Sequence, residues 1–341
     1  MGLLLCLVGC DNQELERQAK KQQEKIEKLQ GENDVLKRDA DKVKSLGSQI
    51  KDLNSQNEKL KNEIKGIESS RKDNAELKRT LAEKDTILEL KKELGEEFIF
   101  GYLKPFVIAG NISQQNFDQI KNGTLTRCST VLYKDCFNKK PAYPIRVYLF
   151  RDAASYEAYC MKTWRIKPTT PYGFYEQTSN RLVMNIATGT GTLVHEMAHA
   201  LIEPDFPNVP AWFNEGSGTL YEQCNTDQTG SLRGLINWRY NGLMQAAQKN
   251  QLISLQKLMN LTDREFYGPN SGLHYAQARY FFLYLQENKV LPQFYKKFRD
   301  NFANDKNGIK LVEELLKKSI DEIDKNWRKW LPTVKNIAEL R

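Results

Sequence analysis

The spacing of apolar residues divides the chain into two parts. Residues 12–94 contain no proline, no aromatic residue and no cysteine. Apolar residues recur there at intervals of seven, and a second series follows the first three residues later in the sequence. The first series comprises Leu15, Leu29, Leu36, Val43, Ile50 and Ile64, and the second comprises Leu46, Leu53, Leu60, Ile67, Leu81 and Leu88. This heptad pattern predicts one long coiled-coil helix over residues 12–94.

Polar residues interrupt both series. Gln22, Asn57 and Arg71 stand in the first series, and Asn74 stands in the second. An asparagine in the seam fixes the register and favours a dimer, at a cost in stability. A homodimer is therefore one expectation for this helix. A looser helix that packs on a partner protein, or on the chain's own globular part, is the other.

The pattern changes after residue 95 to short apolar runs separated by turns and longer helical segments. Apolar runs rich in β-branched residues predict strands at 145–150 and 181–186. A strand at 174–177 is expected to pair with 181–186 through the turn Thr178-Ser179-Asn180. We therefore predict an α+β fold, in which the coiled-coil helix precedes a domain over residues 96–335 with a small β-sheet lobe and a helical lobe.

A segment rich in histidine follows the strand predicted at 181–186. His195-Glu196-Met197-Ala198-His199 holds two of the three histidines in the chain. Residues four apart lie on one face of a helix, so both imidazoles can reach one zinc ion. Glu196 then lies beside the metal as a candidate general base. The alternative is an ordinary amphipathic turn of a helix that Pro204 brings to an end.

A catalytic zinc site usually takes a third ligand from the protein. Glu215 lies sixteen residues after His199, in Trp212-Phe213-Asn214-Glu215-Gly216, where a second helix is predicted to begin. A turn between Pro204 and Pro210 would fold that helix back on the first, so we predict Glu215 as the ligand. Glu203, one turn beyond His199, is the rival, and an interaction of Glu215 with its own helix dipole is the alternative.

These two segments, HEMAH and W-F-N-E-G, resemble the gluzincin metallopeptidases and most closely the bacterial peptidase-MA-like domains. The resemblance covers roughly residues 96–335. It implies that His195, His199 and Glu215 bind Zn²⁺ and that Glu196 is the general base. The spacing to Glu215 is shorter than in gluzincin aminopeptidases, and no Gly-Ala-Met-Glu-Asn-type element is present. An endopeptidase is therefore expected rather than an aminopeptidase.

The resemblance also implies a group that stabilises the oxyanion formed during amide hydrolysis. Tyr275 matches the family's Tyr-Ala-Gln segment, and His274, the third histidine, precedes it. Successive helical residues diverge by about a quarter turn, so only one of the two side chains should face the metal. We predict Tyr275 as that residue.

Gluzincins bind the substrate backbone as an added strand on an exposed sheet edge. The strand before the histidine segment is the expected edge, so Val183, Met184 and Asn185 are the predicted substrate-binding residues. A core strand without substrate contact is the alternative.

The first ten residues predict the compartment. Residues 2–9 are almost wholly apolar, and Leu7-Val8-Gly9-Cys10 fits the bacterial lipobox. We predict residues 1–10 as a lipoprotein signal peptide ending at Cys10, whose lipidation would anchor the chain to a membrane of a bacterial cell envelope, on its periplasmic or extracellular face. The stretch is too short to span a bilayer. An unusual, apolar native start is the alternative.

Four further cysteines lie in the predicted globular part: Cys128, Cys136, Cys160 and Cys224. In an exported protein they are candidate disulfides, for example as Cys128–Cys136 and Cys160–Cys224, although four cysteines allow three connectivities. Buried free thiols are the alternative.

The net charge of +8 changes the picture little. Residues 12–94 are nearly neutral, so most of the excess lies in the globular part. We read it as ordinary solubility charge rather than as a surface for anionic polymers. No nucleic-acid motif is present. The sequence thus predicts a lipid-anchored, zinc-dependent peptidase acting on peptide or protein substrates. A non-catalytic envelope scaffold that retains the peptidase fold is the alternative.

Overall fold

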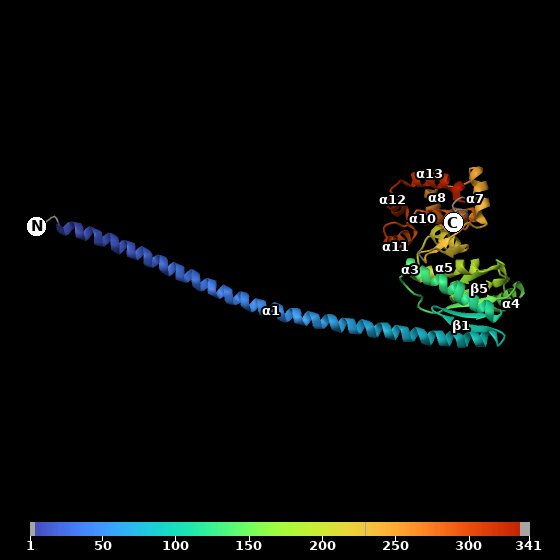
Figure 1. The fold of residues 1–341 in the computed structure, drawn as a ribbon, viewed down its shortest axis with the longest axis horizontal. Helices are drawn as coiled ribbons and strands as arrows, with labels where there is room; N and C mark the ends of the chain where they lie inside the picture. Colours follow the sequence, from blue (N-terminus) through green and yellow to red (C-terminus); the bar gives the residue numbers. More distant parts are fainter. Residues whose placement is uncertain (1–3, 229, 335–341) are drawn as a thin grey trace. The chain divides into compact units, whose positions relative to one another are not determined.

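The computed structural model describes residues 4–228 and 230–334, with side chains from Leu15 onward. It is a mixed α/β protein with a long N-terminal helix and a small sheet, which confirms the predicted fold class at that level. The chain divides into two compact units, and the boundary in the sequence lies between Glu76 and Leu77 (Figure 1). The predicted lipidation site, Cys10, lies outside the residues whose side chains are described. Among the described helices, none combines the length and apolarity needed to cross a membrane.

The first unit consists of helix α1 (Leu4–Leu94) as far as Glu76. Apolar residues of both heptad series are exposed on it, and Val43 has 68% of its surface in contact with solvent. A helix whose apolar seam is wet gains stability from a partner surface. The predicted helix is confirmed, whereas its self-association stays a prediction.

The end of α1 belongs to the second, globular unit. This unit begins within the helix, and not after residue 94 as the heptad pattern predicted. Leu90 is fully buried and Glu83 is nearly so, whereas the seam residues Leu81 and Leu88 are 53% and 56% exposed. Residues 77–94 therefore pack on the globular unit through a helix face that differs from the heptad seam.

A five-stranded sheet forms one layer of the globular unit, in the order β1-β2-β3-β5-β4. Its strands are β1 (Ile99–Leu103), β2 (Phe106–Gly110), β3 (Ile145–Phe150), β4 (Gly173–Glu176) and β5 (Arg181–Asn185). Strands β2, β3 and β5 run parallel, and β1 and β4 lie antiparallel at the two edges. The strand at 145–150 and the hairpin joining β4 to β5 are confirmed, whereas β2 was not predicted.

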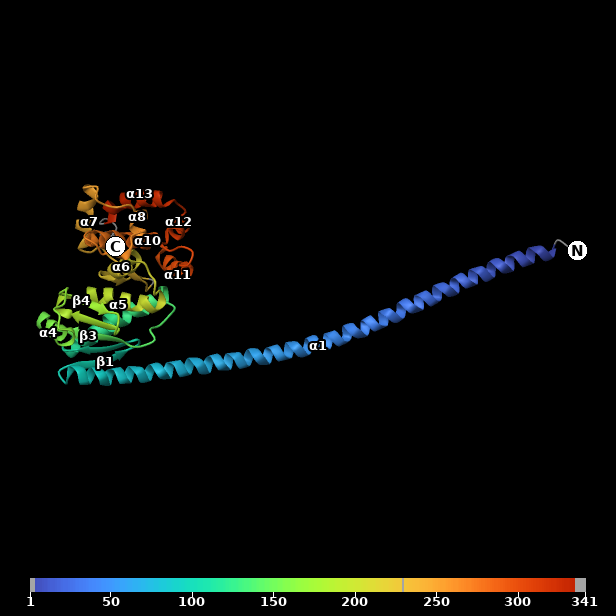
Figure 2. The same ribbon diagram turned by 180° about the vertical axis from the view of Figure 1, so that it is seen from behind.

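Both faces of the sheet are covered by helices. Val107 and Ala109 of β2 pack with Leu90 of α1 and with helix α4 (Ala153–Trp164). Their neighbours Phe106 and Ile108 point the other way, into the main core, with helices α3 (Arg127–Asp135) and α5 (Gly191–Asp205). The end of α1 lies along β1 in both views (Figures 1 and 2). Because side chains alternate across a strand, a strand covered on both faces is buried throughout, as β2 is.

The rest of the unit is mainly helical. Short helices α2 (Gln114–Asp118) and η1 (Gln119–Thr126) precede α3, and η2 (Ile186–Thr188) precedes α5. After α5 come α6 (Ala211–Tyr221), the two-stranded sheet of β6 (Cys224–Thr226) and β7 (Leu232–Gly234), α7 (Arg239–Gln248), α8 (Leu255–Met259), α9 (Asp263–Phe266), α10 (Ser271–Glu287), α11 (Leu291–Asn301), α12 (Ile309–Leu316), α13 (Ile320–Trp330) and η3 (Leu331–Thr333). Helices α6 and α10 pack directly on each other, and α6 also packs on α5, which joins the sheet-covering helices to the closing helical subdomain.

The prediction of an exposed edge at 182–186 is wrong. Strand β5 lies between β3 and β4 and pairs with both. Val183, Met184 and Asn185 are buried inside the sheet, so they cannot accept an added substrate strand. The edge on this side of the sheet is β4.

The suggested cysteine pairing is also wrong. All four cysteines of the globular unit are free thiols. Cys128 and Cys136 are eight residues apart along α3 and its C-cap, which separates their Cα atoms by about 12 Å. Cys160 lies in the core on the opposite face of the sheet from Cys128 and Cys136, and Cys224 packs against the core that holds those two. Neither Cys128–Cys136 nor Cys160–Cys224 fits this arrangement.

Candidate metal centre

Two antiparallel helices carry the candidate metal ligands. Helix α5 contains His195 and His199, and it runs through Pro204 to Asp205 instead of stopping before the proline. Proline lacks the backbone donor for one intrahelical bond, and because Pro204 lies next to the last residue of α5, no later turn of the helix is disturbed. Helix α6 begins after Pro210 and packs back on α5. A β-carbon at Gly218 would lie 3.0 Å from Nδ1 of His195, so a glycine there allows the helices to approach closely.

The side chains of His195, His199 and Glu215 converge. Nε2 of His195 lies 2.9 Å from Nε2 of His199, and each lies 3.4 Å from Oε2 of Glu215. Glu215 is only 5% exposed, and its Oε2 has no hydrogen-bond partner. A buried carboxylate oxygen without a donor is costly unless a cation or a proton compensates it. This group could hold a metal ion.

Glu196 faces the edge strand rather than the ligands. Its Oε2 accepts a hydrogen bond of 3.0 Å from the backbone N–H of Tyr175 in β4, while its Oε1 lies 4.0 Å from Nε2 of His195. The register of β4 with β5, together with the bond from Asn185 N–H to the Tyr172 carbonyl, turns the backbone polar groups of Gly173 and Tyr175 away from β5. The edge strand therefore orients the carboxylate of Glu196 directly.

Two residues that the sequence analysis did not identify hold the far nitrogens of the histidine rings. Asn214 Oδ1 lies 2.9 Å from Nδ1 of His199. Glu222 Oε1 lies 3.2 Å from Nδ1 of His195, at ion-pair distance but without hydrogen-bond geometry. Arg239 bonds in turn to Glu222. Such outer contacts fix the ring orientation and tune a metal site. Glu222 follows Glu215 by seven residues, about two helical turns, and this spacing could have identified Glu222 from the sequence.

The electrostatics of the cluster favour a shared charge. Burial opposes a positive charge on His195, but its contacts with Glu215, Glu222 and Glu196 raise its pKa to about 10. Burial likewise opposes a charge on Glu215, yet the two neighbouring imidazoles hold its pKa well below the ordinary value. The pKa of Glu222 is also lowered, against its burial, by His195 and Arg239. The cluster therefore supplies the anionic charge that a bound cation requires.

Two tyrosines lie at Glu215. The hydroxyl of Tyr267 donates a hydrogen bond of 2.8 Å to its Oε1, and Tyr275 lies close enough for this carboxylate to shift its pKa. Burial, followed by the nearby charge of Glu215, raises the pKa of both phenols, so both keep their protons. His274 instead bonds through Nδ1 to the Phe266 carbonyl and lies in the core. Of the two predicted candidates, Tyr275 is thus the one at the cluster, and Tyr267 was missed.

The rival ligand, Glu203, has other partners. Its carboxylate accepts hydrogen bonds of 2.5 Å from the Tyr175 hydroxyl and 2.7 Å from Nε2 of Gln177. It lies outside the group of three converging ligands. Tyr175 thereby contacts two carboxylates of α5, Glu196 through its backbone and Glu203 through its side chain.

Two hollows meet at the cluster. One of about 400 Å³ is lined by His199, Glu203 and Tyr175, and one of about 920 Å³ is lined by Gly173, the threonine-rich turn at 188–192 and Arg239. Both are lined by His195, Glu196 and Tyr275. An extended ligand could therefore pass along Glu196, with a part on each side of it.

No protein-family model matches the chain, and the curated proteins include none with similar sequence. The geometry of the site therefore carries the functional argument.

Proposed function

We propose that the globular unit is a zinc-dependent peptidase. The observation that carries this proposal is the convergence of two imidazole nitrogens and a buried, otherwise unpartnered carboxylate oxygen where two hollows meet. Two nitrogen donors and one oxygen donor suit zinc, and three protein ligands leave a position for water, as in catalytic sites. When bound, the ion supplies a Lewis acid and makes a coordinated water more acidic.

The chain's own residues supply the proton transfers in this proposal. Glu196 is the general base, which takes a proton from the attacking water and returns it to the leaving amine. The N–H of Tyr175 fixes the direction of this carboxylate. Tyr275 is the proposed donor to the oxyanion because it carries a protonated hydroxyl and lines both hollows.

Strand β4 is the proposed substrate platform, in place of the inner strand β5. An extended peptide can add to a sheet edge through main-chain hydrogen bonds. Gly173 lines the larger hollow and Tyr175 the smaller one, and the backbone groups of both face away from β5. The presence of a hollow on each side of Glu196 supports an endopeptidase acting on a peptide or protein chain.

The N-terminal part of the proposal concerns location. We propose lipidation of Cys10 and attachment to a membrane of a bacterial cell envelope, with the helix of residues 12–76 acting as a stalk. The exposed heptad seam favours an additional role in association, with a second copy or with another helix. It is also the observation that supports the second candidate function, a non-catalytic envelope scaffold.

Peptide cleavage by matched variants separates the two functions. The full chain, Glu196→Gln and Glu157→Gln are loaded with zinc, and each is incubated with a mixed peptide library that is analysed by mass spectrometry. Glu196→Gln removes the base and no ligand, so it should keep the metal and lose most cleavage, about 100-fold or more. Glu157→Gln makes the same chemical change on a half-buried residue of α4, far from the cluster in the sequence, and should behave like the parent.

Two outcomes would count against the peptidase. Equal cleavage by Glu196→Gln and the parent would remove Glu196 as the base. Zinc-loaded parent protein that cleaves neither peptides nor proteins would favour the scaffold. Metal content is measured in the same samples by elemental analysis, so a loss of cleavage is not confused with a loss of zinc.

A further inference from the structure

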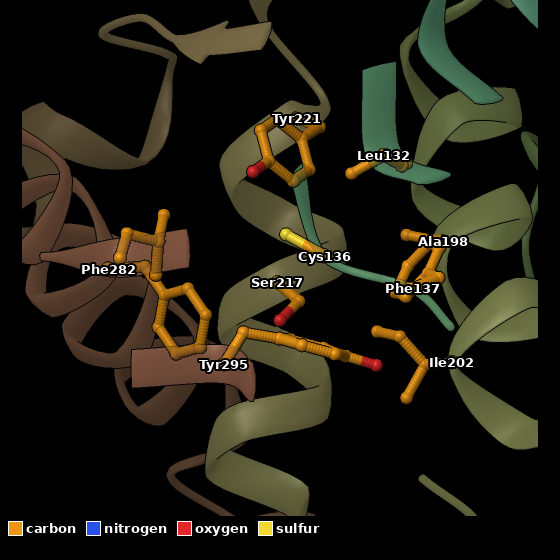
Figure 3. A pocket seen from close by; sticks show the side chains of 10 residues that line it. Leu132, Cys136, Phe137, Ala198, Ile202, Ser217, Tyr221, Phe282 and Tyr295 are labelled. Carbon is orange, nitrogen blue, oxygen red and sulfur yellow. The ribbon is translucent and has the colours of Figure 1, made fainter. Parts of the chain in front are cut away.

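The four thiols of the globular unit occupy three separate environments. Cys160 lies in the smaller core, between the sheet and α4. Cys136 lines an enclosed cavity of about 20 Å³ between α3, α5 and α6 (Figure 3). Cys128 and Cys224 both line the larger of the two hollows at the metal centre. Of the pairs that four cysteines allow, only Cys128 and Cys224 share an environment.

Cys128 and Cys224 are direct neighbours. The two thiols lie close enough for each to shift the pKa of the other. Cys128 is fully buried in α3, and Cys224, the first residue of β6, is partly exposed at the hollow. The β6–β7 hairpin also packs on α3 through β7. The chain between the two cysteines includes the strands β3 to β5 and both metal-binding helices.

We propose that Cys128 and Cys224 are a redox-active pair that forms a disulfide joining α3 to β6. The oxidant is a disulfide of a thiol–disulfide oxidoreductase or of a small-molecule thiol pool. The Cys224 sulfur, which faces the hollow, attacks that disulfide, forms a mixed disulfide and releases one thiol of the oxidant. The Cys128 sulfur then attacks Cys224 and releases the second thiol. Two protein thiols become one disulfide as the oxidant's disulfide becomes two thiols.

Access rather than acidity sets this order of attack, because Cys224 is partly exposed at the hollow and Cys128 is fully buried. The contact with Cys224 lowers the pKa of Cys128, which favours a thiolate at the buried, resolving position. The same contact and burial raise the pKa of Cys224, so the exposed thiol is the slower first nucleophile. The first exchange should therefore limit the rate, and the second should follow rapidly.

The bond would brace the wall of the metal centre. Cys224 lies two residues after Glu222, which contacts His195. A β-carbon at Gly191 would lie 2.6 Å from the Glu222 carbonyl oxygen, so this part of the chain is already packed tightly against the start of α5. Fixing Cys224 to α3 restrains the segment that positions Glu222. The inference does not depend on the proposed peptidase activity.

Peptide mapping tests the pair directly. The reduced full chain is incubated with an oxidised glutathione buffer, free thiols are alkylated, and the protein is digested with trypsin without reduction. Cleavage after lysine and arginine places the four thiols in four different peptides, residues 128–134, 135–139, 152–162 and 182–233. We expect 128–134 linked to 182–233, with the loss of two hydrogen atoms, and the other two peptides alkylated.

Serine variants provide the controls. Cys136→Ser should keep the link, whereas Cys128→Ser should lose it and leave Cys224 open to alkylation. Oxidation should raise the melting temperature of the parent but not that of Cys128→Ser. A link between 182–233 and 135–139, or alkylation of all four peptides after full oxidative treatment, would overturn the proposal. The parent's peptide map decides the question even if a serine variant does not fold.

Discussion

The clearest structural prediction concerns two leucines two residues apart on α1. Leu90 is fully buried against the sheet, whereas Leu88 is 56% exposed on the heptad seam. Replacing a buried leucine by alanine removes its transfer free energy and leaves a cavity, which together cost about 2–5 kcal/mol. The same change at an exposed position costs roughly 0.5 kcal/mol or less. Leu90→Ala should therefore destabilise the globular unit strongly, and Leu88→Ala should not.

Glu93 adds a polar contribution to the same docked segment. Its carboxylate accepts hydrogen bonds from the hydroxyls of Tyr148 and Tyr159 and pairs with Arg181 at 3.3 Å. Losing such a partner leaves part-buried donors unsatisfied, at about 1–3 kcal/mol for each group. Deleting residues 77–94 would remove Leu90 and Glu93 together. The loss would then be comparable to the roughly 5–15 kcal/mol that stabilises a typical domain.

Urea denaturation of two truncated proteins and the two alanine variants measures these effects. Residues 77–341 should unfold cooperatively with near-parental stability, whereas residues 95–341 should unfold at much lower urea or fail to fold. The slope of the transition reports whether the exposed area also changes. If Leu90→Ala and Leu88→Ala unfold at the same urea concentration, residues 77–94 do not dock on the sheet, and the boundary lies near residue 94 after all.

Three further predictions concern the metal centre and the first unit. Glu222→Gln should weaken zinc binding about 10–100-fold, measured by competition with a chelator, because it removes the charge that faces His195. Zinc affinity should rise with pH up to about 10, by roughly tenfold per unit, because His195, whose pKa is raised to about 10, holds a proton that the metal must displace; an affinity that does not change between mildly acidic and mildly basic buffer would contradict this. Residues 12–76 should self-associate through the exposed seam, so their helix content by circular dichroism should increase with concentration; a concentration-independent signal from a monomer in sedimentation would point to a partner helix instead.

The candidate metal ligands could be predicted because they lie close together in the sequence, on two consecutive helices. His195 and His199 share a helix face by helical geometry alone. Glu215 required one further inference, that Pro204 to Pro210 turns the chain back. The strand at 145–150 could also be predicted, because its nearly continuous apolar run is typical of a strand buried on both faces.

The sheet edge could not be predicted in the same way. Whether β5 is an edge or an inner strand depends on which other strand pairs with it, and no periodicity within 181–186 encodes that choice. The pairing of β4 with β5 was predicted correctly, and the edge prediction failed because β3 also pairs with β5, on its other side. The predicted boundary between the coiled coil and the globular unit was wrong for a similar reason. The heptad series of α1 continues through Leu81 and Leu88, whereas the buried face is set by contact with the sheet.

Three residues that contact carboxylates of the site come from distant segments. Tyr175 comes from the edge strand, Tyr267 follows the short helix α9, and Arg239 begins α7 and reaches Glu222. None is within fifteen residues of the side chain it contacts, so sequence spacing carries no signal for them. The donor atoms are thus encoded in two adjacent helices, but their orientation depends on the folded unit. An isolated peptide spanning α5 and α6 would retain every ligand and lose the contacts of all three residues, so ligand identity alone is insufficient to define this site.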